Sequence, residues 1–301
     1  MSYPHEDKFF AYLQERDAIR LRKAKGDVFP WTDDPILQRY SFTNVFREHD
    51  RTTVGLNESF YRENANAPMR DILMNATMFR FFGRLEFCQA VGWQIQKAFD
   101  FEHVRRTARQ WKAEGKTVFT GAYNISNQGK RLPKEDVILD HVLKPLQSAI
   151  CNGLLDVARE TQSWQEFSKA LCKQNGFKEF MAKEVMLDTM LTWFWDDRKF
   201  LHSYPKDYMK WTPIGPGAIR GACRVVDGVR REGQILLVNG MSEDRVRAII
   251  LDLMERCPLI DHRKLSPTDI QFGLCEFDKY QRAQDGHKLK KRYHPRLLPL
   301  V

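Results

Sequence analysis

The sequence predicts a mostly α-helical fold, and three of its features support this prediction. Its long segments are rich in leucine, alanine, methionine, lysine and glutamate, which favour helices. Apolar residues in these segments recur at helical spacing, so that each helix has one face for a core. The alternation of apolar and polar residues that marks a half-buried strand is confined to a few short runs, of which residues 233–239 (GQILLVN) are the clearest.

The predicted helices follow one another along most of the chain. The first covers about residues 5–26, with an apolar stripe that starts at Phe9 and a glycine, Gly26, that ends it. A second is expected from about Pro35 to Asp50, after a loop whose aspartates can cap it. Further helices are expected at about 69–82, 86–99, 101–114, 134–158, 161–174, 176–193 and 270–282. The segment KTVFTGAYNISNQGK (116–130) interrupts this series with a β-like run and a loop rich in glycine and asparagine.

Length and composition allow a sizeable core, in one helical domain over residues 1–301 or in two lobes. No apolar run approaches the ~20 residues that span a bilayer. The N-terminal residues MSYPHEDKFF lack the apolar region of a signal peptide, so we expect a cytoplasmic protein without membrane contact. The six cysteines are scattered without zinc-binding spacing, and neither GxGxxG nor GxxxxGK[ST] occurs. We therefore expect no metal site and no cofactor.

The chain carries a formal net charge of +9. Such a balance attracts polyanions, of which DNA and RNA are the commonest. A basic C-terminal tail, residues 286–301, contains HKLKKRYHPR and is expected to add phosphate contacts. The alternative is a solvated basic surface with no partner.

The densest charged segment is RYSFTNVFREHDRTT, residues 39–53. On the predicted second helix, residues three or four positions apart share a face, so Asn44, Arg47 and Arg51 would form one stripe. Two arginines on one stripe can clamp an anion, with Asp50 beside them. The alternative is a surface helix with local ion pairs between the arginines and Asp50.

A second candidate site is the segment 209–226, MKWTPIGPGAIRGACRVV, which resembles a helix-hairpin-helix element of the kind that base-excision DNA glycosylases use to hold the DNA backbone. Gly215 and Gly217 lack a Cβ atom and would let the hairpin backbone approach a phosphate. The N–H groups at the start of the following helix attract an anion, and Arg220 could add a cation. Tight turns between two helices also use such glycines, so the pattern alone is weak.

Carboxylates on two other segments are candidates for acid–base chemistry. Asp188 lies four residues after Glu184 on the apolar segment FMAKEVMLDTMLTWFWDD, where a carboxylate is either at a solvated edge or in a pocket. Glu276 belongs to a third cluster, IQFGLCEFDKYQR, which otherwise reads as a surface helix with local ion pairs.

Seven motifs taken together carry a family resemblance. They occur in the order PWTDDPIL, YSFTNVFREHDRTT, MFRFFGRLE, TGAYNIS, MAKEVMLDTM, GPGAIRG and LCEFDKY. In this order they resemble the alpha-glutamyl/putrescinyl-thymine pyrophosphorylase family, the phage amino acid:DNA transferases. The chain is also similar to the helical domain attached to 5-hydroxymethyl-deoxyuridine (5-hmdU) DNA kinases. The resemblance covers about residues 10–285.

The resemblance implies a helical, DNA-glycosylase-like fold and a role in thymine hypermodification of phage DNA that carries 5-hydroxymethyluracil. A kinase phosphorylates or pyrophosphorylates the hydroxymethyl group within DNA, and a transferase then lets an amine displace the phosphate. The amine is an amino acid or a polyamine such as putrescine. The lack of a P-loop favours the transferase. The implied partners are double-stranded phage DNA, the amine co-substrate and a 5-hydroxymethyluracil DNA kinase as functional partner.

Such a reaction assigns roles to the candidate residues. The target nucleotide has to be flipped out of the duplex, because its base is otherwise out of reach. Arg47 and Arg51 would clamp the leaving phosphate, and Asn44 would bind the uracil edge. The attacking amine has to be neutral, so a carboxylate takes its proton. The stacking candidates are Trp31, Phe42 and Trp211, and the general-base candidates are Asp50, Asp188 and Glu276.

Two other functions remain open for a chain of this kind. A DNA glycosylase-like excision enzyme on the same scaffold would release a free base. A non-catalytic DNA-binding module would instead recruit the 5-hydroxymethyluracil DNA kinase.

Overall fold

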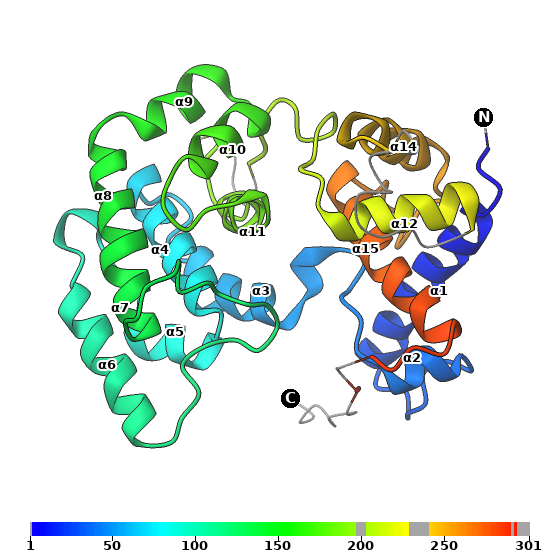
Figure 1. The fold of residues 1–301 in the computed structure, drawn as a ribbon, viewed down its shortest axis with the longest axis horizontal. Helices are drawn as coiled ribbons and strands as arrows, with labels where there is room; N and C mark the ends of the chain where they lie inside the picture. The colour runs from blue at the N-terminus through cyan, green and yellow to red at the C-terminus, as the bar shows by residue number, and fades with distance from the viewer. Residues whose placement is uncertain (1, 197–202, 229–240, 290–291, 294–301) are drawn as a thin grey trace. The chain divides into compact units, whose positions relative to one another are not determined.

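The computed structural model describes residues 2–196, 203–228, 241–289 and 292–293. The described chain is mostly helical and holds no β-strand, only two isolated bridges. It divides into two compact units (Figure 1). Unit 1 comprises Met1–Asp50 and Met209–Val301, and unit 2 comprises Arg51–Tyr208. The predicted strand at 233–239 and most of the predicted basic tail at 286–301 lie outside the described residues.

Unit 1 is built around the long C-terminal helix α15. Its helices are α1 (Glu6–Ala24), α2 (Pro35–Arg39), the 3₁₀ helix η1 (Arg47–His49), α12 (Pro216–Asp227), α14 (Glu243–Arg256) and α15 (Pro267–Gln284). Helices α1, α2, α12 and α14 all pack against α15. A capping box starts α15: the Ser266 hydroxyl accepts from the Asp269 N–H, and the Asp269 carboxylate accepts from the Ser266 N–H.

Two glycines of α12 allow it to pack closely on α15. A Cβ atom on Gly221 would lie 2.1 Å from the carbonyl oxygen of Leu274, and one on Gly217 would lie 2.8 Å from Cys275 Sγ. Gly217 therefore faces the neighbouring helix α15. This corrects the prediction that the missing Cβ of Gly217 lets the backbone approach a DNA phosphate. At Gly215, by contrast, no atom lies within 4 Å of a Cβ position.

Unit 2 is a helical bundle around α4. Its elements are α3 (Arg51–Leu56), the π-helix η2 (Asn57–Tyr61), α4 (Met69–Phe82), α5 (Leu85–Val91), η3 (Gln96–Ala98), α6 (Phe101–Ala113), α7 (Lys134–Ile138), the π-helix η4 (Leu139–Leu143), α8 (Lys144–Cys151), α9 (Leu154–Thr161), α10 (Trp164–Cys172) and α11 (Glu179–Thr189). Helix α4 is buried along almost its whole length and packs on α5, α8 and α11. Gly83 ends α4 in the left-handed conformation, with φ 65°.

Several predicted elements are corrected by the structure. The helix predicted over Pro35–Asp50 ends at Arg39, and the next residues are extended before η1. The helices predicted at 86–99, 161–174 and 176–193 are shorter, and the one at 134–158 breaks at Gly153, whose φ is 92°. No strand forms in the β-like run at 116–130. Residues 203–215 are turns and extended chain, so no described helix directly precedes the Gly-Pro-Gly turn.

Within residues 2–196, 203–228, 241–289 and 292–293, no helix is long and apolar enough to cross a membrane. Nor do His, Cys, Asp and Glu side chains gather there in a group that could hold a metal ion.

Gly221→Ala should destabilise unit 1, because the new methyl group would overlap backbone that cannot move aside as a side chain can. We expect the free energy of unfolding to fall by about 1–3 kcal/mol. Gly215→Ala is the matched control and should change it by less than about 0.5 kcal/mol. Urea unfolding of both variants measures the difference. Equal midpoints would contradict the close packing of α12 on α15.

Candidate functional site

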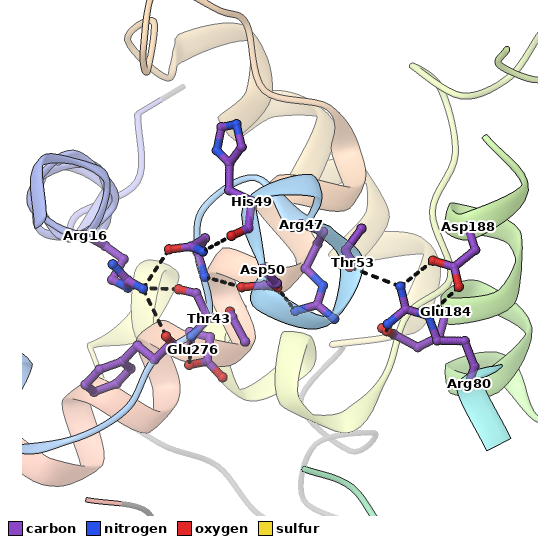
Figure 2. A network of polar contacts seen from close by, with 12 residues as sticks. Arg16, Thr43, Arg47, His49, Asp50, Thr53, Arg80, Glu184, Asp188 and Glu276 are labelled. Carbon is purple, nitrogen blue, oxygen red and sulfur yellow. Dashed lines mark hydrogen bonds and ion pairs between the residues drawn. The ribbon is translucent and has the colours of Figure 1, made fainter. Parts of the chain in front are cut away.

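The extended segment of residues 42–46 carries a polar network in unit 1 (Figure 2). The N–H of Thr43 donates to Glu276 Oε2 at 3.0 Å, and the N–H of Asn44 donates to Asp50 Oδ1 at 3.0 Å. Two consecutive amides thus hold two carboxylates from different elements. The Asn44 side chain is occupied within the segment, since its Nδ2 donates to the carbonyl oxygen of His49 at 2.7 Å.

Arg16 of α1 holds this segment in place. Its guanidinium donates to the carbonyl oxygens of Phe42 and Thr43 at 3.1 and 3.0 Å, and to Asn44 Oδ1 at 2.8 Å. In a helix, the carbonyl oxygens of Phe42 and Thr43 would accept hydrogen bonds from N–H groups further along the same helix. Here they accept hydrogen bonds from the Arg16 guanidinium instead. This contact explains why the predicted helix does not continue through these residues.

Arg47 stands beside Asp50 at the edge of the network. Its Nη1 pairs with Asp50 Oδ2, and its guanidinium carbon lies 4.6 Å from the ring centroid of Phe272. Both partners of the ion pair keep 18% of their side-chain surface exposed. Arg51 belongs to unit 2, where it is exposed and pairs with Glu86 at 2.8 Å. The predicted helical stripe of Asn44, Arg47 and Arg51 is therefore wrong, because no helix joins them.

Glu276 lies on α15 with a lysine and an aromatic ring beside it. Lys279 Nζ donates to Glu276 Oε2 at 3.0 Å and lies 4.6 Å from the centroid of the Phe42 ring. Both of these hydrogen bonds, from the Thr43 N–H and from Lys279 Nζ, reach Oε2 of the Glu276 carboxylate. The ring of Phe42 is half-buried and also packs edge-on against Tyr12 and Tyr280. Phe42 is thus part of an aromatic cluster as well as of the network.

His49 follows Arg47 in η1 and was not predicted as a site residue. Burial lowers the pKa of its imidazole, and the positive charges of Arg20 and Arg263 lower it further. The imidazole Nδ1 is buried, and no described residue forms a hydrogen bond with it. The ring points away from Arg47 and Asp50 (Figure 2).

Asp188 lies in unit 2 and is completely buried. Arg80 of α4 binds both of its oxygens, and the Tyr61 hydroxyl donates to Oδ2 at 2.9 Å. Arg80 also donates to Thr53 at 3.1 Å and lies 3.6 Å from Glu184 (Figure 2). Burial raises the pKa of Asp188, and the hydrogen bonds from Arg80 oppose that rise by favouring the carboxylate. In this arrangement Asp188 is a structural counter-ion.

Trp211 and Arg220 flank the Gly-Pro-Gly turn of unit 1. Trp211 is half-buried, and the guanidinium of Arg247 lies 5.7 Å from its ring centroid. Arg220 Nε donates to Asp278 of α15 at 3.0 Å, and its side chain remains 27% exposed. Gly215 is the N-cap of α12, whose first N–H groups have no side-chain cap.

Trp31 lines a pocket of about 430 Å³ between α1 and the loop before α2. The pocket is lined by Glu15, Arg22, Pro30, Trp31, Thr32, Asp33 and Asp34. The one cation among these lining residues is tied to the pocket wall, since Arg22 Nη1 donates to Glu15 at 2.9 Å and to the carbonyl oxygen of Trp31 at 2.6 Å. Outside the lining, Lys23 Nζ lies 5.6 Å from the centroid of the Trp31 ring. Three carboxylates outweigh Arg22, so the pocket repels phosphate and suits a cation.

Sequence reasoning missed the two arginines on which these networks depend. The role of Arg80 could have been predicted, because Arg80 and Asp188 each lie within an apolar segment. Charged side chains that are buried with such segments have to pair with each other. The role of Arg16 could not have been predicted, because its acceptors are distant in sequence and mostly backbone atoms.

Comparison with known proteins gives a family match over nearly the whole chain. The model of the helical domain of 5-hmdU DNA kinases matches residues 4–289. A 5-hmdU DNA kinase of Bacillus phage SP10 is 26% identical over 296 residues, which cover 91% of this chain and 44% of the relative. The chain thus spans less than half the length of that relative. No solved structure matches the chain.

Asp188→Asn should destabilise unit 2 strongly, because it leaves Arg80 as a buried charge without a full partner. We expect the free energy of unfolding to fall by about 3–5 kcal/mol. Glu86→Gln removes the carboxylate of an exposed ion pair and should cost at most about 1 kcal/mol. Urea unfolding compares the two. A small, equal loss in both variants would refute a structural role for Asp188.

Proposed function

The chain belongs to the family of helical domains of 5-hmdU DNA kinases, and from this premise we propose that it is an amino acid or polyamine:DNA transferase in phage thymine modification. In the proposed reaction a neutral amine attacks the 5-methylene carbon of phosphorylated or pyrophosphorylated 5-hydroxymethyluracil in DNA. The carbon–oxygen bond breaks, and its electron pair leaves with the phosphate or pyrophosphate. The amine's proton passes to a carboxylate. The observation that carries this proposal is the unit 1 network, which joins a guanidinium and two carboxylates through one short segment.

The proposed substrate is duplex DNA with the target nucleotide flipped out, because the methylene carbon of a stacked base is hard to reach. The Gly-Pro-Gly turn supports contact with the backbone. Gly215 is open, and the uncapped N–H groups at the start of α12 attract an anion. Half-buried Trp211 beside this turn is the proposed surface for the flipped base, and a glycosylase-like fold with a helix-hairpin-helix grip remains part of this proposal.

Arg47 is the proposed clamp for the leaving phosphate. Its pairing with Asp50 orients the guanidinium, and its contact with the Phe272 ring limits its freedom to turn. A fixed, planar fork can bind two phosphate oxygens at once and stabilise the charge that builds on them as the bond breaks. Asn44 sets this geometry through Asp50, although its own side chain is already hydrogen-bonded to His49.

Glu276 is the proposed general base. Its Oε2 accepts from Thr43 and Lys279, which fix the carboxylate, and Oε1, to which no hydrogen bond is made within the described part of the chain, is the proposed acceptor of the amine proton. The side chain keeps 17% of its surface exposed, so a substrate can reach it. Asp50 contacts Arg47 and Asn44 instead, which favours an orienting role.

The pocket at Trp31 is the proposed site of the amine co-substrate. An ammonium group is attracted by carboxylates and by the face of an indole ring, and both line this pocket. Adjacent residues of α1 connect it with the network, since Glu15 lines the pocket and Arg16 holds the segment at Thr43. With three carboxylates and one paired arginine in its lining, the pocket favours a diamine or polyamine over an amino acid, and the bound ammonium would take the place of Lys23 at the Trp31 ring.

The second candidate is a DNA-binding module without catalysis. It is favoured by the family itself, because the match is to a domain of a DNA kinase, and the chain spans 44% of the relative. In that case the networks described above would only stabilise the fold.

One experiment separates these functions. The chain is incubated with DNA that contains 5-phosphomethyluracil and with a mixture of amines, and the DNA is then digested to nucleosides for mass spectrometry. An amine adduct at the methylene carbon supports the transferase. Abasic sites would instead show a glycosylase, and unchanged nucleosides with bound DNA would show a binding module.

Arg47→Lys should lower the single-turnover rate of amine transfer about a hundredfold, because lysine keeps the charge and loses the fork. DNA affinity should change far less, since other phosphate contacts remain. Arg51→Lys is the matched comparison, and near-normal turnover is expected there because Arg51 is exposed and paired with Glu86. Wild-type rates in Arg47→Lys would place the clamp elsewhere. Glu276→Gln should also slow transfer, with the melting temperature as a check on folding.

Trp31→Leu should raise the KM for a diamine roughly two- to fivefold, because it removes a cation–π contact at a partly exposed site. The kcat and the affinity for DNA should stay close to wild type. Val28→Leu, a change in the same loop outside the pocket lining, serves as the control. Steady-state kinetics with the amine varied measure the effect. An unchanged KM would exclude this pocket as the amine site.

A further inference from the structure

The loop between α6 and α7, residues 114–133, has a fixed inner part and an exposed basic end. The phenyl ring of Phe119 stacks on that of Phe82 at 5.4 Å, and the Thr120 N–H donates to the carbonyl oxygen of Phe82 at 2.9 Å. The Tyr123 hydroxyl donates to the carbonyl oxygen of Arg80 at 2.5 Å. The loop is therefore held against the C-terminal end of α4. Long loops of this kind in compact domains usually serve a function.

A second segment, before and at the start of α11, runs beside this loop. The rings of Tyr123 and Phe180 contact edge-on at 5.2 Å, and Gln128 lies next to Gly176. Later residues of the loop thus meet earlier residues of the second segment, so the two run in opposite directions. Lys178 lies between these two contact points in sequence.

Four exposed cations occupy these two segments: Lys130, Arg131, Lys173 and Lys178. Within the described part of the chain, none of them has an ion-pair partner. The neighbouring helices differ in this respect, because Lys112, Lys144 and Lys169 all pair with carboxylates. The loop holds no acidic residue from 115 to 133, and 173–183 contains one carboxylate, Glu179.

An aromatic ring is exposed beside these cations. Phe180 keeps 42% of its surface exposed at the start of α11, and Lys183 Nζ lies 5.7 Å from its ring centroid. Exposed aromatic rings among lysines and arginines are the usual platform for unpaired bases of a nucleic acid strand.

We propose that Lys130, Arg131, Lys173, Lys178 and Phe180, here named the loop patch, bind a DNA strand. The cations contact successive phosphates, and Phe180 stacks on an unpaired base. This inference rests on the proposed function only in taking DNA as the occupant. It adds a DNA contact in unit 2 to the Gly-Pro-Gly turn proposed in unit 1.

The charge and the ring together favour DNA over an acidic protein partner. An acidic protein surface would form ion pairs with the cations alone, and the exposed ring of Phe180 would make no contact with it. A strand of DNA uses both, because phosphates alternate with bases that have an apolar face. A solvated basic loop would also leave the ring without a role.

The test compares two charge-reversal variants of the full chain on the same labelled, unmodified oligonucleotide, as a single strand and as a duplex. Lys130→Glu/Arg131→Glu removes two cations of the loop patch. Lys97→Glu/Arg106→Glu is the matched control, with the same charge change at exposed, unpaired positions of unit 2. Fluorescence anisotropy across a salt series gives the affinities.

We expect the loop-patch variant to bind the single strand at least about tenfold more weakly than the control variant does. Its salt slope should shrink by about 1.4, because each phosphate contact on a single strand contributes about 0.7. Equal affinities and slopes in the two variants would overturn the proposal. Much tighter binding of wild-type protein to RNA of the same sequence would overturn DNA as the occupant.

The ring is tested separately. Phe180→Leu should weaken single-strand binding about tenfold, whereas Phe180→Trp should retain it, because only tryptophan keeps a stacking face. Equal loss in both would refute stacking. These assays need no amine and no modified base. If the loop-patch variants bind DNA as the wild type does, the loop patch is refuted and the proposed amine transfer is untouched. If DNA gains no amine adduct, the proposed amine transfer is refuted and the loop patch is untouched.

Discussion

The contact on which the unit 1 site depends is the guanidinium of Arg16 bound to residues 42–44. Because two carbonyls and one amide oxygen of this segment accept from Arg16, the segment stays extended, and its N–H groups at Thr43 and Asn44 turn to carboxylates instead of joining a helix. The single positive charge also offsets part of the repulsion between Asp50 and Glu276. A helix in the same place would satisfy its own amides and leave both carboxylates without these donors.

Unit 2 depends on an arginine in a similar way, but with a different consequence. Arg80 and Asp188 are both buried, and their pairing draws Thr53, Tyr61 and Glu184 into one network. Four of the motifs that carry the family resemblance supply Thr53, Arg80, Tyr123, Glu184 and Asp188, whereas Tyr61 lies outside them; the Tyr123 hydroxyl donates to the backbone of Arg80. Breaking this buried ion pair would leave an uncompensated charge in the core of unit 2, which is a structural reason for these residues that needs no catalytic role for Asp188.

The sequence predicted most where local rules decide the structure. Helix α4 was predicted with its observed bounds, because a continuous apolar segment ends at a glycine that can take a positive φ. The helix over Pro35–Asp50 was wrong because Arg16, on another element, competes for its carbonyls. Gly217 was misread for a related reason: whether a glycine faces a ligand or a neighbouring helix depends on how α12 packs on α15. The candidate residues Asp50, Arg47 and Glu276 remain predictions as site residues, and their connection through Thr43 and Asn44 was not foreseeable from spacing.

The proposed reaction explains why a helical domain of this kind would combine acidic and basic surfaces. Displacing a phosphate with an amine needs a cation at the leaving group and carboxylates at the amine, and these requirements conflict within one pocket because phosphate and carboxylates repel each other. In unit 1 the two requirements are met by different side chains of α1, since Arg16 fixes the segment that leads to Arg47 while its neighbour Glu15 lines the acidic pocket at Trp31. In the proposed reaction DNA would be held by cations outside that pocket, where its charge does not oppose the entry of the amine. In the proposed reaction the phosphate placed on the base by a kinase is the leaving group, and the helical domain supplies the charge and orientation for its departure.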